Sequence, residues 1–176
     1  INGERLARAA ELFPPSYAAQ RGIELVYVNT GEGGHSAGKL RSYTEQGRGY
    51  DDIFVMAPVA AVIEQADDIL AFDGCLNFFA GPSDTGLKAK MNFYNIHYGY
   101  THVTATSGGN TDDMREVVAM AEQGLDPAGL VTHIGGPDAV VQATPDLPNI
   151  PGGKKLIYTH IEMPPTAIAG CAGEGK

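Results

Sequence analysis

Helix-like and strand-like patterns alternate along most of this chain, and this alternation is the strongest constraint on its fold. Residues 51–58 (DDIFVMAP) and 75–81 (CLNFFAG) are largely apolar, as expected for strands that are buried on both faces of a sheet. Residues 60–71, between them, have a helical pattern and are followed by an Asp73-Gly74 turn. A strand, a helix and a second strand favour a parallel α/β sheet over a sandwich or a helical bundle.

The same scheme extends to both sides of this unit. The other predicted strands are residues 24–29, 101–107, 126–136 and 154–162, and the other predicted helices are residues 1–13, 36–47, 112–124 and 138–143. Asn110 or Thr111 is expected to cap the helix after residues 101–107, because short polar side chains satisfy the first free N–H groups of a helix. Residues 91–98 are apolar and aromatic, and they predict either a short helix or a docking segment.

Composition and charge exclude several classes of function. The chain has 12 Lys and Arg against 21 Asp and Glu, a formal net charge of -9, so it would repel nucleic acid and anionic membranes. No apolar run reaches the ~20 residues that a membrane helix needs, and no signal peptide is recognisable. The sequence therefore predicts a soluble, cytoplasmic protein. Cys75 and Cys171 have no second ligand pair and are expected to be free thiols.

A glycine-rich stretch at residues 28–38 (VNTGEGGHSAG) raises the possibility of a phosphate-binding loop. Gly31 and Gly33 fit the GxGxxG fingerprint of dinucleotide sites, but Ser36 stands where the third glycine belongs. No acidic residue ends a second strand ~20 residues later, as that fingerprint requires. A turn with glycines at positive φ is therefore the favoured interpretation.

The histidines and Ser107 do not form recognisable catalytic or metal motifs. His97 and His102 are five residues apart, and none of the five histidines makes an HxH or HxxxH pair. Ser107 lies outside any GxSxG elbow, which argues against a serine hydrolase.

Five short motifs occur in a specific order: NFFAGPSD, MNFYNIHY, SGGNTDDMR, LVTHI and GGKKLIYT. Together they resemble the C-terminal half of the zinc-type medium-chain alcohol dehydrogenase superfamily, and most closely its L-sorbose 1-phosphate reductase group. The resemblance covers nearly the whole chain. It implies an α/β fold that is the C-terminal half of a Rossmann-type parallel sheet with flanking helices, lacking the first two strands and the catalytic zinc domain.

The resemblance also implies a domain organisation. Residues 1–125 would be a partial dinucleotide-binding domain, residues 126–162 the strands and helix that return to the missing catalytic domain, and residues 163–176 a frayed tail. In this family the glycine fingerprint follows the first strand, whereas residues 28–38 follow the third, which supports the turn interpretation. The acidic residue that binds the adenosine ribose would fall just before Ile1.

Cofactor contacts in the resembled fold come from the carboxyl ends of the strands. The residues concerned here are Met56, Ala57 and Pro58 after one strand, Phe79, Ala80 and Gly81 after the next, and Thr106, Ser107 and Gly108 after the third. The first group would lie on the adenosine side, and the other two near the nicotinamide. Without the resemblance, Phe79 would simply be core. Lys155 aligns with a basic residue that faces the cofactor phosphates. No catalytic residue and no metal ligand is expected within this chain.

Two functions follow as expectations. In the first, the chain is a fragment, inactive alone, of an oxidoreductase that uses NAD or NADP, with zinc only in the missing domain and a polyol or sugar phosphate as substrate. In the second, it is a stand-alone truncated α/β module with a dimerisation or interaction role. In both, we expect a homodimer through residues 91–106, because residues 101–107 would form the last strand of the sheet and the preceding segment is aromatic.

Overall fold

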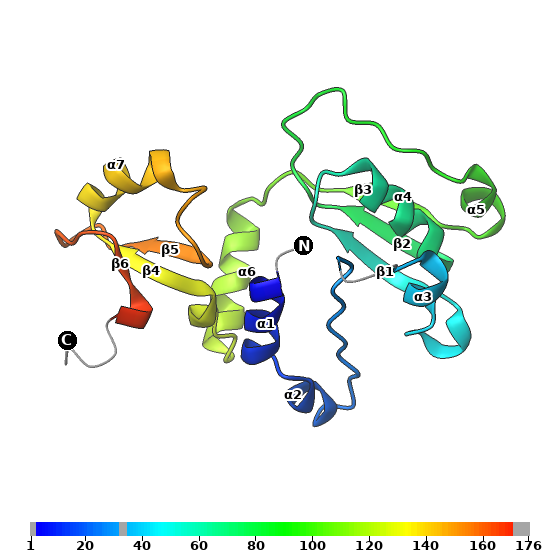
Figure 1. Cartoon of the computed structure of the whole chain (residues 1–176), viewed down its shortest axis with the longest axis horizontal. Helices are drawn as coiled ribbons and strands as arrows, with labels where there is room; N and C mark the ends of the chain where they lie inside the picture. Colours follow the sequence, from blue (N-terminus) through cyan, green and yellow to red (C-terminus); the bar gives the residue numbers. More distant parts are fainter. Residues whose placement is uncertain (1–2, 32–34, 171–176) are drawn as a thin grey trace. The chain divides into compact units, whose positions relative to one another are not determined.

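The computed structural model describes residues 3–31 and 35–170 of the 176-residue chain (Figure 1). The chain divides into two compact units, which we describe separately. The central unit is Thr30–Asn110, and the terminal unit combines Ile1–Asn29 with Thr111–Lys176. No helix among the described residues is long and apolar enough to cross a bilayer.

The central unit contains a three-stranded parallel sheet in the order β1-β2-β3. Its elements are α3 (Ala37–Arg41), the 3-10 turn η1 (Glu45–Gly47), β1 (Tyr50–Val55), α4 (Ala60–Ile69), β2 (Leu70–Phe78), α5 (Phe93–Tyr98) and β3 (His102–Ala105). The predicted strand, helix and parallel strand are thus confirmed as β1, α4 and β2. Residues 91–98, for which two alternatives were open, contain the short helix α5.

The core of the central unit lies between the sheet and α4. Val55, Ala66, Leu70 and Leu76 are buried there, and three partly buried side chains pack against them: Ile53, Ile63 and Phe78. On the opposite face, Phe54 is 61% exposed. The prediction that residues 51–58 are buried on both faces is therefore wrong, because α4 covers one face of β1 within this unit. The apolar run at residues 51–58 did not predict burial correctly, because an apolar sequence does not show which face of a strand another element covers.

The predicted Asp73-Gly74 turn lies inside β2 as an irregularity of the strand. The register shifts from Tyr50 opposite Leu70 to Asp52 opposite Cys75, so β2 bulges between these pairs. Asp73 has a φ of 60°, and its N–H donates to the carbonyl of Gly99 at 2.7 Å. A Cβ on Gly74 would lie 2.9 Å from the carbonyl oxygen of Tyr50, so the bulge needs a glycine there.

The segment that leads into α5 is fastened to α4 by two carboxylates. Glu64 accepts a hydrogen bond from the N–H of Lys90 at 3.0 Å, and the buried Asp67 accepts one from the N–H of Asn92 at 2.7 Å. The side chain of Asn92 in turn caps α5 by accepting from the N–H of Tyr94. These bonds fix where the aromatic helix begins.

The predicted helix at residues 36–47 begins as expected and ends early. Ser36 caps α3 by accepting a hydrogen bond from the N–H of Lys39. The helix ends at Arg41, and Gln46 and Gly47 adopt positive φ values of 53° and 69° in the turn η1. Gly47 therefore terminates a turn rather than the helix itself.

The terminal unit contains a second three-stranded sheet, in the order β5-β4-β6. Its elements are α1 (Gly3–Leu12), α2 (Pro15–Ala19), α6 (Thr111–Glu122), the 3-10 turn η2 (Ala128–Leu130), β4 (Val131–Gly135), α7 (Pro137–Asp146), β5 (Lys154–Ile157), β6 (Thr166–Ala167) and the 3-10 turn η3 (Ile168–Gly170). Strand β4 pairs in parallel with β5 and antiparallel with β6. Strand β6 falls within the segment expected to be a frayed tail, of which residues 171–176, with Cys171, lie outside the described residues.

Residues 24–29 do not form the strand that their β-branched pattern predicts. The chain is irregular there, and its contact is with a helix: the hydroxyl of Tyr27 donates to the carbonyls of Ala9 (3.0 Å) and Phe13 (2.8 Å) at the end of α1. An extended segment becomes a strand only where a neighbouring strand pairs with it.

The domain boundaries predicted from the resemblance stay a prediction.

Candidate functional site

The candidate site lies where two neighbouring parallel strands end. Strands β2 and β3 pair up to Phe78 opposite Ala105, so their carboxyl ends meet at the same edge of the sheet. The chain beyond β2 is tied back to β1, because the N–H groups of Phe79 and Ala80 both donate to the carbonyl of Val55, at 3.1 and 3.0 Å. In open parallel sheets this edge is where ligands bind.

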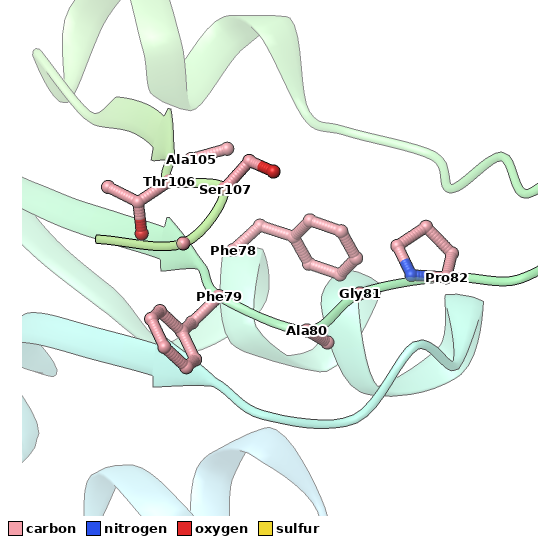
Figure 2. Close-up of a pocket in the computed structure, with 9 residues that line it drawn as sticks. Phe78, Phe79, Ala80, Gly81, Pro82, Ala105, Thr106 and Ser107 are labelled. Carbon is pink, nitrogen blue, oxygen red and sulfur yellow. The ribbon is translucent and has the colours of Figure 1, made fainter. Parts of the chain in front are cut away.

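A hollow of about 360 Å³ occupies this edge, and Figure 2 shows the residues around it. It is lined by Phe78, Phe79, Ala80, Gly81, Pro82, Ala105, Thr106, Ser107 and Gly108. The structure thus brings together two of the three groups of site residues predicted from the sequence. A volume of this size is at the lower end of the range for small-molecule pockets.

Three further residues of this hollow were missing from the prediction. Phe78 and Ala105 are the last residues of β2 and β3, and Pro82 follows the predicted Gly81. Figure 2 shows the ring of Phe78 on the side of Pro82 and Ser107, whereas the ring of Phe79 extends to the other side of the chain. The strand ends were placed too late in the sequence, and a correct end for β2 would have identified Phe78.

The remaining predicted site residues lie outside the hollow. Met56, Ala57 and Pro58 follow β1, and the side chain of Met56 is 63% exposed. Lys155 lies on β5 in the terminal unit, where its ammonium group donates to three carbonyls, those of Ile150 (3.3 Å), Pro151 (3.2 Å) and Gly153 (2.8 Å). This loop contact gives Lys155 a structural role, and its role toward a cofactor stays a prediction.

The lining of the hollow is uncharged. Aromatic and small apolar side chains form its walls, and the hydroxyls of Thr106 and Ser107 are its side-chain hydrogen-bonding groups. A Cβ added at Gly81 or Gly108 would meet no atom within 4 Å, so both glycines leave open space. Such a lining suits a flat, weakly polar ring, and it contains no His, Asp, Glu or Lys that could act as a general base on the two hydroxyls.

No three His, Cys, Asp or Glu side chains gather as potential metal ligands within residues 3–31 and 35–170. The Nε2 atom of His102 lies 3.0 Å from the Oδ1 atom of Asp73, at the opposite end of β3 from the hollow. In the glycine-rich stretch, Gly33 lies outside the described residues, so the turn interpretation of that stretch stays a prediction.

A parallel sheet with a hollow at the carboxyl ends of its strands is typical of open, doubly wound α/β folds, which bind their ligands at that edge. Solved structures support that class at the level of the fold. One is a 2R,3R-butanediol dehydrogenase from Bacillus subtilis, with a TM-score of 0.62 and 20% sequence identity. The aligned region covers 81% of this chain and 36% of the dehydrogenase. Another is an alcohol dehydrogenase zinc-binding domain protein from Burkholderia ambifaria, with a TM-score of 0.65 and 22% sequence identity. The aligned region covers 83% of this chain and 40% of that protein. The predicted α/β class with a Rossmann-type parallel sheet is confirmed.

Sequence relatives are closer. Mannitol-1-phosphate 5-dehydrogenase of Aliivibrio fischeri is 50% identical over 169 residues, 96% of this chain and 40% of that protein. L-sorbose 1-phosphate reductase of Klebsiella pneumoniae is 50% identical over 127 residues, 72% of this chain and 31% of that protein. The uncharacterized protein YggP of Escherichia coli K12 is 55% identical over 177 residues, 100% of this chain and 41% of that protein.

These relatives confirm the family resemblance. The chain is similar to part of mannitol-1-phosphate 5-dehydrogenase and of L-sorbose 1-phosphate reductase, and zinc-type alcohol dehydrogenases are among its neighbours in fold. It spans 31% to 41% of the length of the relatives it matches. No protein-family model matches the chain.

Proposed function

We propose that this chain forms the nicotinamide-binding part of an NAD- or NADP-dependent oxidoreductase that acts on a polyol or a sugar phosphate. The observation that carries this proposal is the 50% identity to mannitol-1-phosphate 5-dehydrogenase over nearly the whole chain. L-sorbose 1-phosphate reductase supports the same substrate class at equal identity. One solved neighbour with the same fold, a zinc-binding dehydrogenase from Sinorhizobium meliloti, is described as bound to NADP.

The hollow fits one end of such a cofactor. About 360 Å³ is enough for a nicotinamide ring with part of its ribose and too little for a whole dinucleotide. The N–H groups of Phe79 and Ala80 already donate to Val55, so these two residues would offer their carbonyls to a ligand. Met56, Ala57 and Pro58, at the end of β1, are our candidates for the adenosine side.

The chemistry is divided between this chain and groups outside it. A bound nicotinamide would supply the site that accepts or donates a hydride. The apolar walls formed by Phe78 and Pro82 would orient the ring and exclude water from it. The groups that act on the substrate carbinol, including any zinc, would come from other sequence, so we propose that these 176 residues alone are inactive. A cytoplasmic location is part of the same proposal.

A hollow-filling substitution tests the binding role. Gly81→Leu adds its side chain to open space, so we expect it to fold normally and to abolish saturation-transfer NMR signals from the nicotinamide protons of NADH and NADPH. Ser83→Leu, in the loop two residues further on, is the matched control and should keep these signals. Equal signals from both variants would exclude the hollow as the nicotinamide site.

Homodimerisation through residues 91–106 belongs to the same proposal. Strand β3 pairs with β2 on one side, all four of its residues are exposed, and no strand among the described residues pairs with its other side. Phe93, Tyr94 and Tyr98 on α5 are also exposed, at 75%, 68% and 61%. Exposed aromatic residues on α5 and an unpaired edge on β3 support an interface. The same features support the alternative, a non-catalytic interaction module.

Light scattering on the wild type and on Val103→Pro tests the dimer. Proline removes a backbone N–H from β3 and cannot join a new ladder, so we expect the variant to be monomeric. A variant that dimerises like the wild type would show that the edge is not the interface. A monomeric wild type would exclude the dimer.

A further inference from the structure

The inference rests on the proposed nicotinamide site and concerns which pyridine nucleotides that site accepts. Nicotinamide and nicotinic acid nucleotides carry the same ring and differ in its substituent, which is an amide in the first and a carboxyl group in the second. The amide has both hydrogen-bond donors and an acceptor, whereas the carboxyl group is ionised at pH 7 and only accepts. The groups that line the hollow therefore decide which form binds.

The chain beyond β2 offers acceptors to a ligand. The N–H groups of Phe79 and Ala80 are occupied, because both donate to the carbonyl of Val55. Among the described residues, no donor reaches the carbonyl oxygens of Phe79, Ala80 or Gly81. An amide N–H can donate to one of these oxygens, whereas a carboxylate would bring its own lone pairs and negative charge beside them.

The chain beyond β3 offers a donor. Ser107 lines the hollow, and Figure 2 shows its side chain on the same side as the ring of Phe78 and Pro82. Its hydroxyl makes no hydrogen bond to another described residue, so it is available to donate to an amide oxygen. An amide that accepts from Ser107 and donates to a carbonyl beyond β2 would use the groups at both strand ends.

No charge in the hollow would compensate a carboxylate. None of the residues that line it is basic, and α4, whose amino end would favour an anion, begins at Ala60 and contributes no residue to the lining. The nearest charged residue along the chain is acidic, namely Asp84, two residues after Pro82. The whole chain has a formal net charge of -9. A carboxylate that leaves water without a cationic partner is strongly disfavoured.

We infer that the hollow selects the amide form of its pyridine nucleotide and rejects the nicotinic acid form. The amide satisfies acceptors and a donor that the folded chain leaves free, and the carboxylate satisfies the donor only. Ser107 is itself exposed, so the hollow is partly open to water and the charge is not fully desolvated. We therefore expect the acid form to bind about tenfold more weakly, the effect of one unpaired polar contact.

Nicotinamide mononucleotide and nicotinic acid mononucleotide test this selection, because they share the ring, the ribose and the phosphate. Ligand-observed NMR titration of the whole chain at pH 7 gives a dissociation constant for each. The titrations are made at about 1 M sodium chloride, where the Debye length is about 3 Å and the long-range field of the chain is screened. About tenfold weaker binding of the acid form supports the inference. Equal binding, or tighter binding of the acid form, overturns it and leaves the nicotinamide site standing. Binding of neither nucleotide overturns both.

A charge substitution tests whether the hollow is responsible for the selection. Ser107→Arg places a guanidinium group at the wall of the hollow, where it can pair with a carboxylate. The affinity for the acid form relative to the amide form should rise about tenfold. Ser83→Arg is the matched control, because it adds the same charge in the loop outside the lining and should leave this ratio unchanged. An equal change of the ratio in both variants, or in neither, overturns the inference.

Discussion

Arg41 donates a hydrogen bond from its guanidinium group to the main-chain carbonyl of Leu70, 2.9 Å away, and so ties α3 to the first residue of β2. The same side chain also reaches the carbonyls of Gly47 (3.4 Å), Arg48 (3.0 Å) and Asp68 (3.1 Å). One cation thus joins the turn before β1 to the end of α4. Carbonyl oxygens at the ends of helices and strands need such a donor where water has limited access.

Arg41→Met should therefore destabilise the chain. The substitution keeps much of the aliphatic stem and leaves several carbonyls without their donor, at a cost of about 2 to 3 kcal/mol in the free energy of unfolding. Urea denaturation measures this change. Arg48→Met is the control, because Arg48 forms an exposed ion pair with Asp51 and its loss should change the stability little. An equal effect from both variants would contradict the role given to Arg41.

The contact between Asp67 and Asn92 leads to a second prediction. Asp67 is 3% exposed, and its Oδ2 accepts the hydrogen bond that fixes the start of α5. Asp67→Ala removes the acceptor and should cost about 2 to 3 kcal/mol. Asp67→Asn retains a carbonyl oxygen and should cost clearly less. Hydrogen exchange at the amide of Asn92 should accelerate in Asp67→Ala, and unchanged exchange would show that this bond is dispensable.

Tyr50 predicts how stability responds to alkaline pH. Burial raises the pKa of its hydroxyl above the usual value of 10.0, with a smaller contribution from Tyr43. The hydroxyl donates to the carbonyl of Leu40 at 2.8 Å, a bond that its ionised form cannot make. Because the pKa is higher in the folded chain than in the unfolded chain, the contribution is complete below pH 10 and is lost as the pH rises through the folded value.

The wild type should therefore lose stability above about pH 10 more steeply than Tyr50→Phe. The free energy of unfolding of both proteins, measured from pH 8 to pH 11, tests this difference in slope. Parallel curves for the two proteins would show that Tyr50 is not responsible.

The sequence predicted well the features that depend on local pattern. The apolar run through Leu76 and the helical spacing around Ala66 gave β2 and α4, because hydrophobic periodicity reports burial directly. Ser36 marked the start of α3 because capping is a contact within four residues. The ends of β2 and β3 followed from the same patterns to within a few residues, and with them most of the hollow.

The features that depend on distant partners were missed. Residues 24–29 look like a strand, yet the hydroxyl of Tyr27 binds the end of α1, a contact that no local pattern encodes. The exposure of Phe54 depends on which elements cover its face of the sheet. The bulge at Asp73 depends on Gly99, 26 residues further along the chain. In each case the deciding partner lies far away in sequence.

Gly136 provides a prediction for the terminal unit. It precedes α7, its N–H donates to the carbonyl of Met163 at 2.8 Å, and a Cβ there would overlap the carbonyl oxygen of Ile161. Gly136→Ala should destabilise this unit by about 3 kcal/mol, because backbone atoms have to move apart. Gly3→Ala, where a Cβ meets no atom within 4 Å, is the matched control and should be neutral or slightly stabilising in thermal unfolding.

The last prediction concerns what the 176 residues do alone. The pyrophosphate of a dinucleotide usually rests on a glycine fingerprint at the start of a helix, and this sequence contains no complete GxGxxG. The hollow at β2 and β3 would hold the nicotinamide end only. We therefore expect weak NAD and NADP binding, no polyol-dependent reduction of either cofactor and no stoichiometric zinc. Calorimetry, a steady-state assay and elemental analysis test these three expectations on the purified chain. A dissociation constant in the low micromolar range would mean that residues outside the hollow bind the pyrophosphate, and the region after β1, with Met56 and Pro58, would be the first place to look.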